Sequence, residues 1–453
     1  MNSTRPVPGP SGRATNDPEY TNKGSRNISS SRSGSVHILA DPTSCFPPEI
    51  LALIFTTGLA IKRPCRRRFE ITVSQVCRKW RYIALGMQHL WTDIHHYNLP
   101  TGILTSSDRM AAYMARSGET PVSLRIRGLV QWYLEAACAP LVIACIHRCY
   151  QLSIDGYWDK SMSSLLTKLL SRPTPLLTSI DVAAWGPMEP LSIPGALLSF
   201  TAPSLTSARI GVPGGTYITA EGTTPPPLPR NVPMYHDLHR AILMNSCSLT
   251  HLELELSRPL RVPLIALPAL KYLLLDIRPF AGGVTQALEP FQAPNLHSIA
   301  LIYNGGRRTL TLPSFEPQFP LLQSLTIIGS IESDSVVPIS LYACLFPHVV
   351  ELTWRDHYPS DHIPNILEQL NEGLAGGGWH GLQTISLSMC GLVHALDVLR
   401  IRDALLKLKE KRPSITKIKL AQHLITAAEG LEELREIVVV EPYLNDWPVP
   451  FLS

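Results

Sequence analysis

The sequence predicts an α/β chain in which a short helical module precedes an irregular solenoid built on a parallel sheet. Helical stripes of apolar residues fill residues 45–95, and a short apolar phrase recurs beyond residue 100 to the end of the chain. A third observation is length, because 453 residues exceed what one ordinary core accommodates. At least two folded units are therefore expected.

Composition excludes several classes of protein. Hydrophobic residues make up 45% and charged residues 17%, which indicates a globular chain. The formal net charge of +4 is too weak to predict binding to nucleic acid or to an anionic membrane. No apolar run reaches the roughly 18 residues of a spanning helix, and the polar start does not resemble a signal peptide. We expect a cytoplasmic or nuclear protein that binds neither membranes nor nucleic acid.

The cysteines predict reduced thiols. There are nine, without a Cys-x-x-Cys pair, which favours neither a disulfide framework nor a zinc ribbon. Cys138, Cys145 and Cys149 form the tightest group, at i, i+7 and i+11 of one expected helical face. Metal binding is one interpretation of this group, and small buried core residues are the other. We predict no metal site and no cofactor.

The first helical stripe follows a polar segment. Residues 1–44 are rich in Ser, Asn, Arg, Gly and Pro, which predicts disorder. Pro47 and Pro48 then suit a helix start, and Glu49 suits its positive end. The next apolar residues are Ile50, Leu51, Leu53, Ile54 and Phe55. They leave scarcely any polar face, so we expect this helix to be covered on more than one side.

A second stripe predicts one amphipathic helix over residues 73–84. Its apolar residues recur at i, i+3, i+4, i+7, i+10 and i+11. They are Val73, Val76, Cys77, Trp80, Ile83 and Ala84. A third short piece carries Leu90, Trp91 and Ile94. Three short helices bury too little apolar area to be stable alone, so this module needs a partner.

These residues closely resemble the F-box motif. The resemblance lies in Phe46–Ile50, Ile54–Phe55, Val73–Ala84 and Leu90–Ile94, although Phe46 stands where Leu is usual. Members of this family dock on a Skp-type adaptor, and through it on a cullin scaffold, within a Skp-cullin-F-box ubiquitin ligase. The resemblance implies the same partners here. The residues that it implies at the adaptor face are Pro47, Ile50, Ile54, Phe55, Val76, Cys77, Trp80 and Trp91.

Two more segments contribute to the predicted organisation. The linker over residues 56–71 is long and basic, with Lys62, Arg63 and Arg66 to Arg68. Such a run is either a nuclear-localisation patch or a solvated loop. Residues 110–118 resemble the helix that joins F-box and repeats in many fungal F-box proteins.

The repeated phrase has an aliphatic residue at i and apolar residues at i+3 and i+5. Ten good copies begin at Leu177, Leu205, Leu249, Leu270, Leu296, Leu322, Val349, Leu382, Ile415 and Leu434, and weaker ones at Cys149 and Leu124. In seven of the ten, proline sits two residues earlier. Proline fixes an entering turn and donates no hydrogen bond, so it is typical just before a strand. Each copy therefore predicts one short strand.

The spacing of the copies predicts a solenoid. Starts lie 19 to 44 residues apart, as in leucine-rich repeats, and stacked copies form a continuous parallel sheet. Helices are expected at residues 161–170, 235–244, 363–370 and 393–409, and loops at 211–233 and 281–290. The predicted organisation is a disordered segment (1–44), an F-box (45–95), a helical linker (96–120) and a leucine-rich-repeat-like substrate-binding domain (121–453).

The same register places two rows of side chains opposite the core. The i+2 row is His251, Tyr272, Ser298, Ser324, Glu351, Thr384 and Lys417, and the i+4 row is Glu253, Leu274, Ala300, Thr326, Thr353, Ser386 and Lys419. We expect a protein substrate to bind there, with His251, Glu253, Tyr272, Glu351, Lys417 and Lys419 as candidate contacts. The loops at 211–233 and 281–290 and the C-terminal tail are alternative binding elements.

Motifs of catalysis are missing from the sequence. It contains no P-loop ending in Gly-Lys-Ser/Thr, no His-Glu-x-x-His and no Gly-x-Ser-x-Gly. Its GxGxxG string at residues 376–381 follows a predicted helix and precedes a strand, the reverse of a dinucleotide site. We expect a non-enzymatic substrate-recognition subunit. The alternatives are a repeat scaffold whose F-box-like helices serve another assembly, and an enzyme with an unrecognised site.

Overall fold

The computed structural model describes most of the chain between residues 45 and 447. The described residues are 45–60, 68–97, 107–129, 138–157, 164–166, 168–169, 171–185, 202–211, 247–256, 264–277, 284–302, 319–329, 339–356, 367–368, 370–371, 379–389, 395–422, 425, 432–444 and 447. The predicted disordered segment 1–44 and the predicted helix 235–244 lie outside them. So do residues 212–233 of the expected loop at 211–233.

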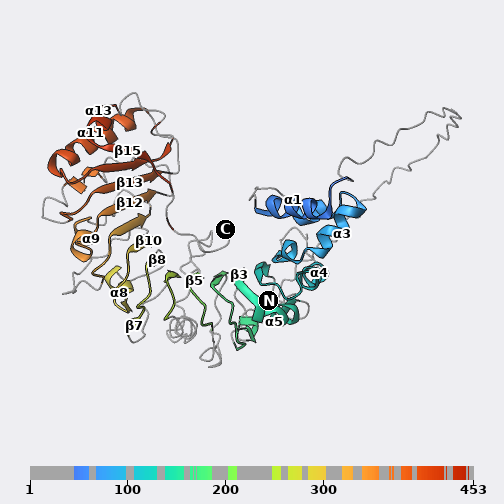
Figure 1. The fold of residues 1–453 in the computed structure, drawn as a ribbon. Coiled ribbons are helices and arrows are strands. Elements are labelled where there is room, and N and C mark those ends of the chain that lie inside the picture. The colour runs from blue at the N-terminus through green and yellow to red at the C-terminus, as the bar shows by residue number, and fades with distance from the viewer. Residues whose placement is uncertain are drawn as a thin grey trace, which may run out of the picture. The chain divides into compact units, whose positions relative to one another are not determined.

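One parallel sheet of 13 strands organises the α/β fold (Figure 1). Each strand pairs with the next one in the sheet, in sequence order, which is the topology of a solenoid rather than of a doubly wound sheet. The strands are β1 (Asp93–Tyr97), β2 (Val122–Leu129), β3 (Cys149–Tyr157), β4 (Ser179–Trp185), β5 (Ser207–Gly211), β6 (His251–Glu255), β8 (Tyr272–Asp276), β10 (Ser298–Ile302), β11 (Ser324–Ile328), β12 (Glu351–Asp356), β13 (Thr384–Met389), β14 (Lys417–Leu420) and β15 (Val439–Pro442). β7 (Ile265–Ala266) and β9 (Phe291–Gln292) form a separate parallel pair.

The predicted register is confirmed across the repeats. Leu273 pairs with Ile299, and Ile299 with Leu325, and all three are fully buried. The same row of core residues runs through the whole sheet as Ile94, Leu124, Leu152, Ile180, Ala208, Leu252, Leu273, Ile299, Leu325, Leu352, Ile385, Ile418 and Val440. Burying one leucine or isoleucine contributes about 1.5–3 kcal/mol, so this row is a main source of stability.

Proline lies in the turn that precedes seven of the strands. The N–H of Leu296 donates to the carbonyl of Ala293, which closes a four-residue turn with Pro294 at its second position. The same bond joins Leu322 to Phe319 around Pro320. Proline favours this turn position because its ring fixes φ near −65°. The physical reason predicted for the recurring proline is therefore confirmed.

The strand predicted from the last copy of the phrase, at Leu434, is wrong. Leu434 and Ile437 were expected to lead into a strand, but both lie in the helix α13 (Glu432–Ile437). β15 begins after the helix, and Val440 rather than Ile437 pairs with Ile418. An i, i+3 pair of aliphatic residues fits a helix as well as this phrase, so the pattern does not discriminate here.

Helices are present in several of the connections between strands that the structure describes. They are α4 (Ser107–Ser117), α5 (Ala139–Cys145), η3 (Ile146–Arg148), α8 (Val284–Leu288), α9 (Ile339–Leu345) and α11 (Ala395–Lys411). In the C-terminal half, α8, α9 and α11 lie on one side of the sheet (Figure 1). α8 corrects the expected loop at 281–290: Val284, Ala287 and Leu288 are buried, so this segment belongs to the core.

Before the sheet comes a helical module made of α1 (Pro48–Ala60), α2 (Phe69–Ser74), α3 (Arg78–Gly86) and η1 (Gln88–Trp91). The single helix expected over residues 73–84 is wrong, because α2 ends and α3 begins within it. The Ser74 hydroxyl donates to the carbonyl of Ile71, and the N–H of Gln75 to that of Thr72, which closes α2. Cys77 is extended, and its sulfur accepts from the N–H of Trp80 at 3.5 Å as the cap of α3.

The sheet begins earlier than the sequence indicates. Ile94 was expected to end the helical module, yet it lies in β1, whose residues cross the predicted boundary at residue 95. The expected helix at 110–118 is present as α4, and it connects β1 to β2. The first two strands and α4 therefore form a parallel β-α-β unit directly after the module.

Three cysteines belong to the core. Cys138, Cys145 and Cys149 are buried, as the second interpretation predicts, but they do not share a helical face, because α5 ends at Cys145 and Cys149 starts β3. Burial raises the pKa of Cys145 to about 11. Burial, with the nearby Cys145, raises the pKa of Cys149 still further.

We expect Cys145 and Cys149 to resist alkylation while the chain is folded. The thiolate is the nucleophile, and at pH 8 a thiol with a pKa of about 11 is almost entirely protonated. Cys45 and Cys247 are exposed and serve as internal controls. Iodoacetamide followed by peptide mass spectrometry measures the four positions together. Alkylation of Cys149 at the rate of Cys247 would show that β3 is not buried.

Candidate interaction surfaces

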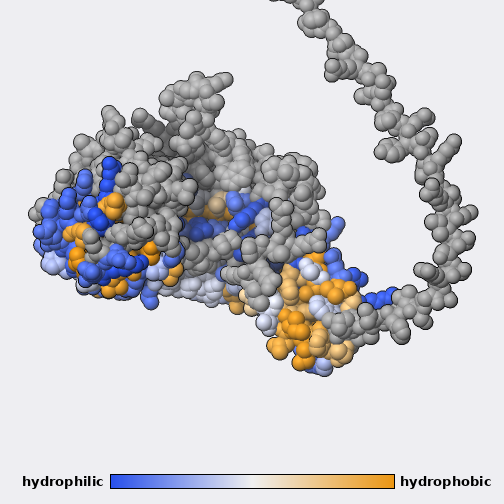
Figure 2. Space-filling view, turned by 90° about the horizontal axis from the view of Figure 1, so that it is seen from above, coloured by the Kyte–Doolittle hydropathy of each residue, from blue (hydrophilic) through white to orange (hydrophobic). Residues whose placement is uncertain are grey.

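The helical module presents an exposed apolar face. Leu53 on α1 is 63% exposed, Val76 between α2 and α3 is 53% exposed, and Tyr82 on α3 is 82% exposed. The other large apolar residues exposed in this region are Phe46, Ile50, Ile54, Leu59 and Leu85. Figure 2 shows hydrophobic side chains gathered over this module. Large exposed apolar patches are typical of interaction sites.

Within the chain itself, α1 is covered on one side only. Leu51 and Phe55, four residues apart, are buried, while Ile50, Leu53 and Ile54 point outward. One face of α1 therefore packs on the module, and the other is left over. The Phe55 ring lies 5.0 Å from the Trp80 ring, at an interplanar angle of 58°.

The structure corrects the expectation that Phe55 and Trp91 lie at the adaptor face. Phe55 is 0% and Trp91 is 1% exposed, so neither can touch a partner without unfolding of the module. The Trp91 indole donates to the carbonyl of Ala84 at 2.8 Å and meets the edge of the Tyr113 ring at 5.1 Å. Trp80 is partly buried against the same core. Of the expected face, Pro47, Ile50, Ile54 and Val76 are exposed, and Cys77 is half-buried.

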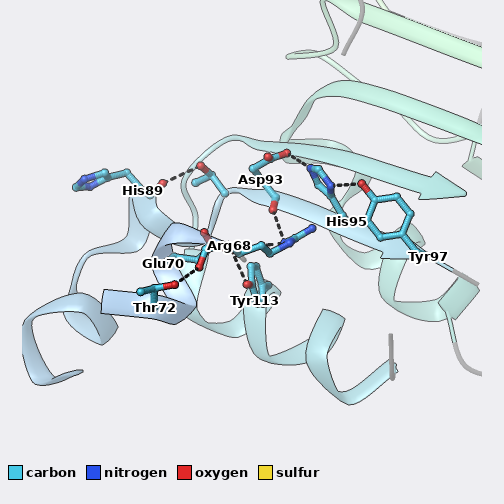
Figure 3. A network of polar contacts seen from close by, with 9 residues as sticks. Arg68, Glu70, Thr72, His89, Asp93, His95, Tyr97 and Tyr113 are labelled. Atoms are coloured by element: carbon cyan, nitrogen blue, oxygen red, sulfur yellow. Dashed lines mark hydrogen bonds and ion pairs between the residues drawn. The ribbon is translucent and has the colours of Figure 1, made fainter. Parts of the chain in front are cut away.

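A polar network ties the module to the first strand (Figure 3). Arg68 lies 3.6 Å from Glu70 and donates to the carbonyl of Asp93 at 3.3 Å, and the Tyr113 hydroxyl donates to Glu70 at 2.7 Å. Arg68 thus belongs to an ordered junction of α2, α4 and β1 and not to a solvated loop. Lys62, Arg63, Arg66 and Arg67 of the same basic run lie outside the described residues.

At the start of β1, His95 bridges two side chains of its own strand (Figure 3). Its ring nitrogens lie 2.7 Å from Asp93 and 2.6 Å from the hydroxyl of Tyr97. Burial lowers the pKa of His95, and the raising effect of Asp93 does not cancel it. The imidazole is therefore neutral near pH 7, and its role here is a structural hydrogen bond.

The face of the sheet opposite the core is a polar surface, which we call the polar face. Its two rows have the predicted register, since His251 pairs with Tyr272 and Glu253 with Leu274. Both rows extend to the first strand. The i+4 row reads His95, Arg125, Ser153, Asp181, Arg209, Glu253, Leu274, Ala300, Thr326, Thr353, Ser386, Lys419 and Glu441.

Acidic and basic side chains alternate across the neighbouring strands β4, β5 and β6. Arg209 forms ion pairs with Glu253 and, at 3.6 Å, with Asp181, and His251 lies 2.9 Å from Glu253. Burial by itself raises the pKa of Glu253, but hydrogen bonds from His251 and Arg209 outweigh it and hold that pKa below its ordinary value. Glu253 is therefore a buried, ionised acceptor.

A second charged group lies on β12 to β15. Lys419 pairs with Glu351 at 2.8 Å, and Lys417 pairs with Glu441 at 3.0 Å. These side chains remain partly exposed, so a partner can reach them. Between the two charged groups the rows carry Leu274 and Ala300.

A segment after β15 returns across this face. Tyr443 donates its N–H to the carbonyl of Leu420, and Trp447 donates from its indole to Glu253 at 3.2 Å. The Trp447 ring lies 5.7 Å from His251 and 6.1 Å from Tyr272. We call Tyr443, Leu444 and Trp447 the C-terminal strap. The sequence did not indicate these contacts.

The strap contacts three of the candidate substrate-binding residues. His251 and Glu253 are buried, and Tyr272 is half-buried beside Trp447, so the expectation that these residues are open to a partner is wrong in this conformation. Glu351, Lys417 and Lys419 are the candidates that stay partly accessible.

Comparisons with known proteins identify no family. No protein-family model matches the chain, and no curated protein matches it in sequence. Among solved structures, the chain is similar to a Bacteroides fragilis protein studied by crystallography, at 14% identity over 75% of this chain and 79% of that one. The TM-score is 0.31, and at that value the likeness does not bear on function.

Two further properties of the described residues are relevant to possible sites. Within them, no three His, Cys, Asp or Glu side chains are grouped so that they could hold a metal ion. Among the helices that the structure describes, none combines the length and apolar character needed to cross a lipid bilayer.

Proposed function

We propose that this chain is the substrate-recognition subunit of a Skp-cullin-F-box ubiquitin ligase. In this proposal the helical module is an F-box that docks on a Skp-type adaptor. The 13-stranded solenoid is a leucine-rich-repeat-like domain that binds a protein substrate. The chain itself performs no catalysis, because its role is to raise the local concentration of substrate near a ubiquitin-loaded enzyme.

The observation that carries the proposal is the apolar face of the module. The residues that resemble an F-box divide into a filled core, with Phe55, Trp80 and Trp91, and a set of exposed aliphatic residues that includes Ile50, Ile54 and Val76. A helix with surplus apolar surface is stabilised by a partner that covers it. The adaptor is the partner that the resemblance implies.

The polar face supports the second half of the proposal. Residues of this face that stay partly exposed on neighbouring strands, among them Ser324, Glu351, Thr384 and Lys417, offer contacts to an extended protein segment. Glu351, Lys417 and Lys419 provide both signs of charge at one end. A protein substrate fits this pattern better than a small molecule, which needs an enclosed and mostly apolar pocket.

Mixing the purified full chain with a purified Skp-type adaptor tests the proposal. We expect the full chain and the adaptor to co-elute as a 1:1 complex in size-exclusion chromatography. A scaffold whose helices serve another assembly would leave the adaptor in its own peak. Proteins that accumulate on the full chain under proteasome inhibition then identify the substrate.

A further inference from the structure

The contacts of Trp447 define a site on the polar face. Its indole N–H donates to the ionised Glu253, and its ring meets His251 and Tyr272 nearly edge-on, at interplanar angles of 71° and 81°. A hydrogen bond to a buried carboxylate is stronger than one between neutral groups. The site therefore selects an aromatic side chain that also carries a donor.

Reaching this site requires a curved sheet. Four residues lie between Pro442 and Trp447, and the five extended steps from one to the other span at most about 18 Å. Six steps between neighbouring strands lead from β15 to β8, or about 29 Å on a flat sheet. The backbone after Pro442 would not cover a flat sheet of that width, so the curvature of the strands and the length of the Trp447 side chain together bring its ring to β6 and β8.

A second peptide cannot share the site with the strap. The space lined by the strap and by strands β8 to β12 has a volume of about 90 Å³. Peptide and ligand sites are commonly several hundred cubic ångströms in volume. A partner that uses the polar face near β6 and β8 must displace Trp447.

The strap is held weakly enough to be displaced. Leu444 is 65% exposed, and the contacts described for Trp447 are one hydrogen bond and two ring contacts. A short tether gives the strap a high effective concentration, so it fills the site in the free chain. A longer partner segment that also contacts Glu351 or Lys419 gains binding energy that the strap lacks.

We propose that His251, Glu253 and Tyr272 form an anchor site for a tryptophan or tyrosine of an extended peptide in a protein partner, and that Trp447 occupies this site until the partner displaces it. This inference rests on the proposed function in one respect, because it takes the partner to be the substrate. The strap is then a built-in competitor that sets the affinity threshold for substrates.

A fluorescent peptide with the sequence of residues 441–453 tests the site in trans. We expect it to bind the full chain carrying Trp447→Ala at least tenfold more tightly than the wild-type chain, as measured by fluorescence anisotropy. The reason is that the wild-type strap competes for the same site. Equal binding to the two chains would overturn the proposal.

Peptide variants test the chemistry of the anchor. Peptides that differ only at the Trp447 position are expected to bind the Trp447→Ala chain in the order Trp, Tyr, then Phe and Ala, with at least tenfold between Trp and Ala. Phe keeps the ring but lacks the donor to Glu253. A Phe peptide that binds as tightly as the Trp peptide would contradict the hydrogen-bonded anchor.

Folding of the variant is checked by thermal melting against the wild-type chain. If Trp447→Ala lowers the melting temperature strongly, Trp447→Phe replaces it, because this change removes only the indole donor. The Trp peptide must then bind Trp447→Phe more tightly than wild type, and equal binding again overturns the proposal. No adaptor is present in these assays, so their failure and a failure of adaptor docking are distinguishable.

Discussion

Leu325→Asp is expected to unfold the solenoid. Leu325 is fully buried and lies between Ile299 and Leu352 in the core row. Aspartate there removes a leucine from the core, which costs about 2–5 kcal/mol, and buries an unpaired charge, which costs several kcal/mol more. The sum is comparable with the whole stability of an ordinary domain. Urea unfolding followed by circular dichroism measures the effect.

Gln323→Asp is the matched control for Leu325→Asp. Gln323 lies two residues earlier in the same repeat, and its side chain is exposed. We expect this variant to change the free energy of unfolding by less than about 0.5 kcal/mol. A Leu325→Asp chain as stable as the control would mean that β11 has the opposite register.

Phe55→Ala is expected to destabilise the helical module by about 3–5 kcal/mol. The change removes a fully buried ring and its contact with Trp80. Amide hydrogen exchange in α1 and α3 measures the effect locally, because the rest of the solenoid need not unfold with the module.

Ile54→Ala provides the comparison for Phe55→Ala. Ile54 is the adjacent residue on α1 and is exposed, so its truncation should alter exchange in α1 and α3 by less than about 1 kcal/mol. Similar protection losses in the two variants would show that α1 does not divide into a buried face and a free face.

The sequence predicts the strands well because two independent signals coincide. Apolar alternation identifies the inward side chains, and proline marks the turn before the strand, as at Pro294 and Pro320. The proline is missing before Leu249, Leu382 and Leu434. β6 and β13 still follow the first two, but at Leu434 the apolar spacing also fits a helix, and α13 forms instead. Register follows from the strands, because parallel repeats stack with equivalent residues side by side.

The surfaces are less predictable from the sequence. A helix that is apolar on all sides does not reveal which face is buried. The sequence therefore predicts an adaptor contact at Phe55, which is buried, and none at Leu53, which is exposed. The sequence places Cys77 in a continuous helix. Its role as the cap of α3 depends on its extended backbone, which the apolar pattern does not reveal. Trp447 carries no periodic signal at all, and its contact with Glu253 depends on the curvature of six strands between them.

Adaptor affinity of a surface variant tests the central proposal most directly. The double variant Leu53→Glu and Ile54→Glu places two charges on the exposed face of α1 and leaves the core residues Leu51 and Phe55 intact. Leu399→Glu, which changes an exposed leucine on α11, is the control. Calorimetric titration of each purified chain with a Skp-type adaptor gives the dissociation constants.

We expect the double variant to bind the adaptor at least 100-fold more weakly than the wild-type chain, which is about 2.7 kcal/mol, with an unchanged melting temperature. The Leu399→Glu chain should bind as the wild type does. Wild-type affinity in the folded double variant, or no adaptor binding by the wild-type chain, would contradict the assignment of the helical module as an adaptor-docking F-box.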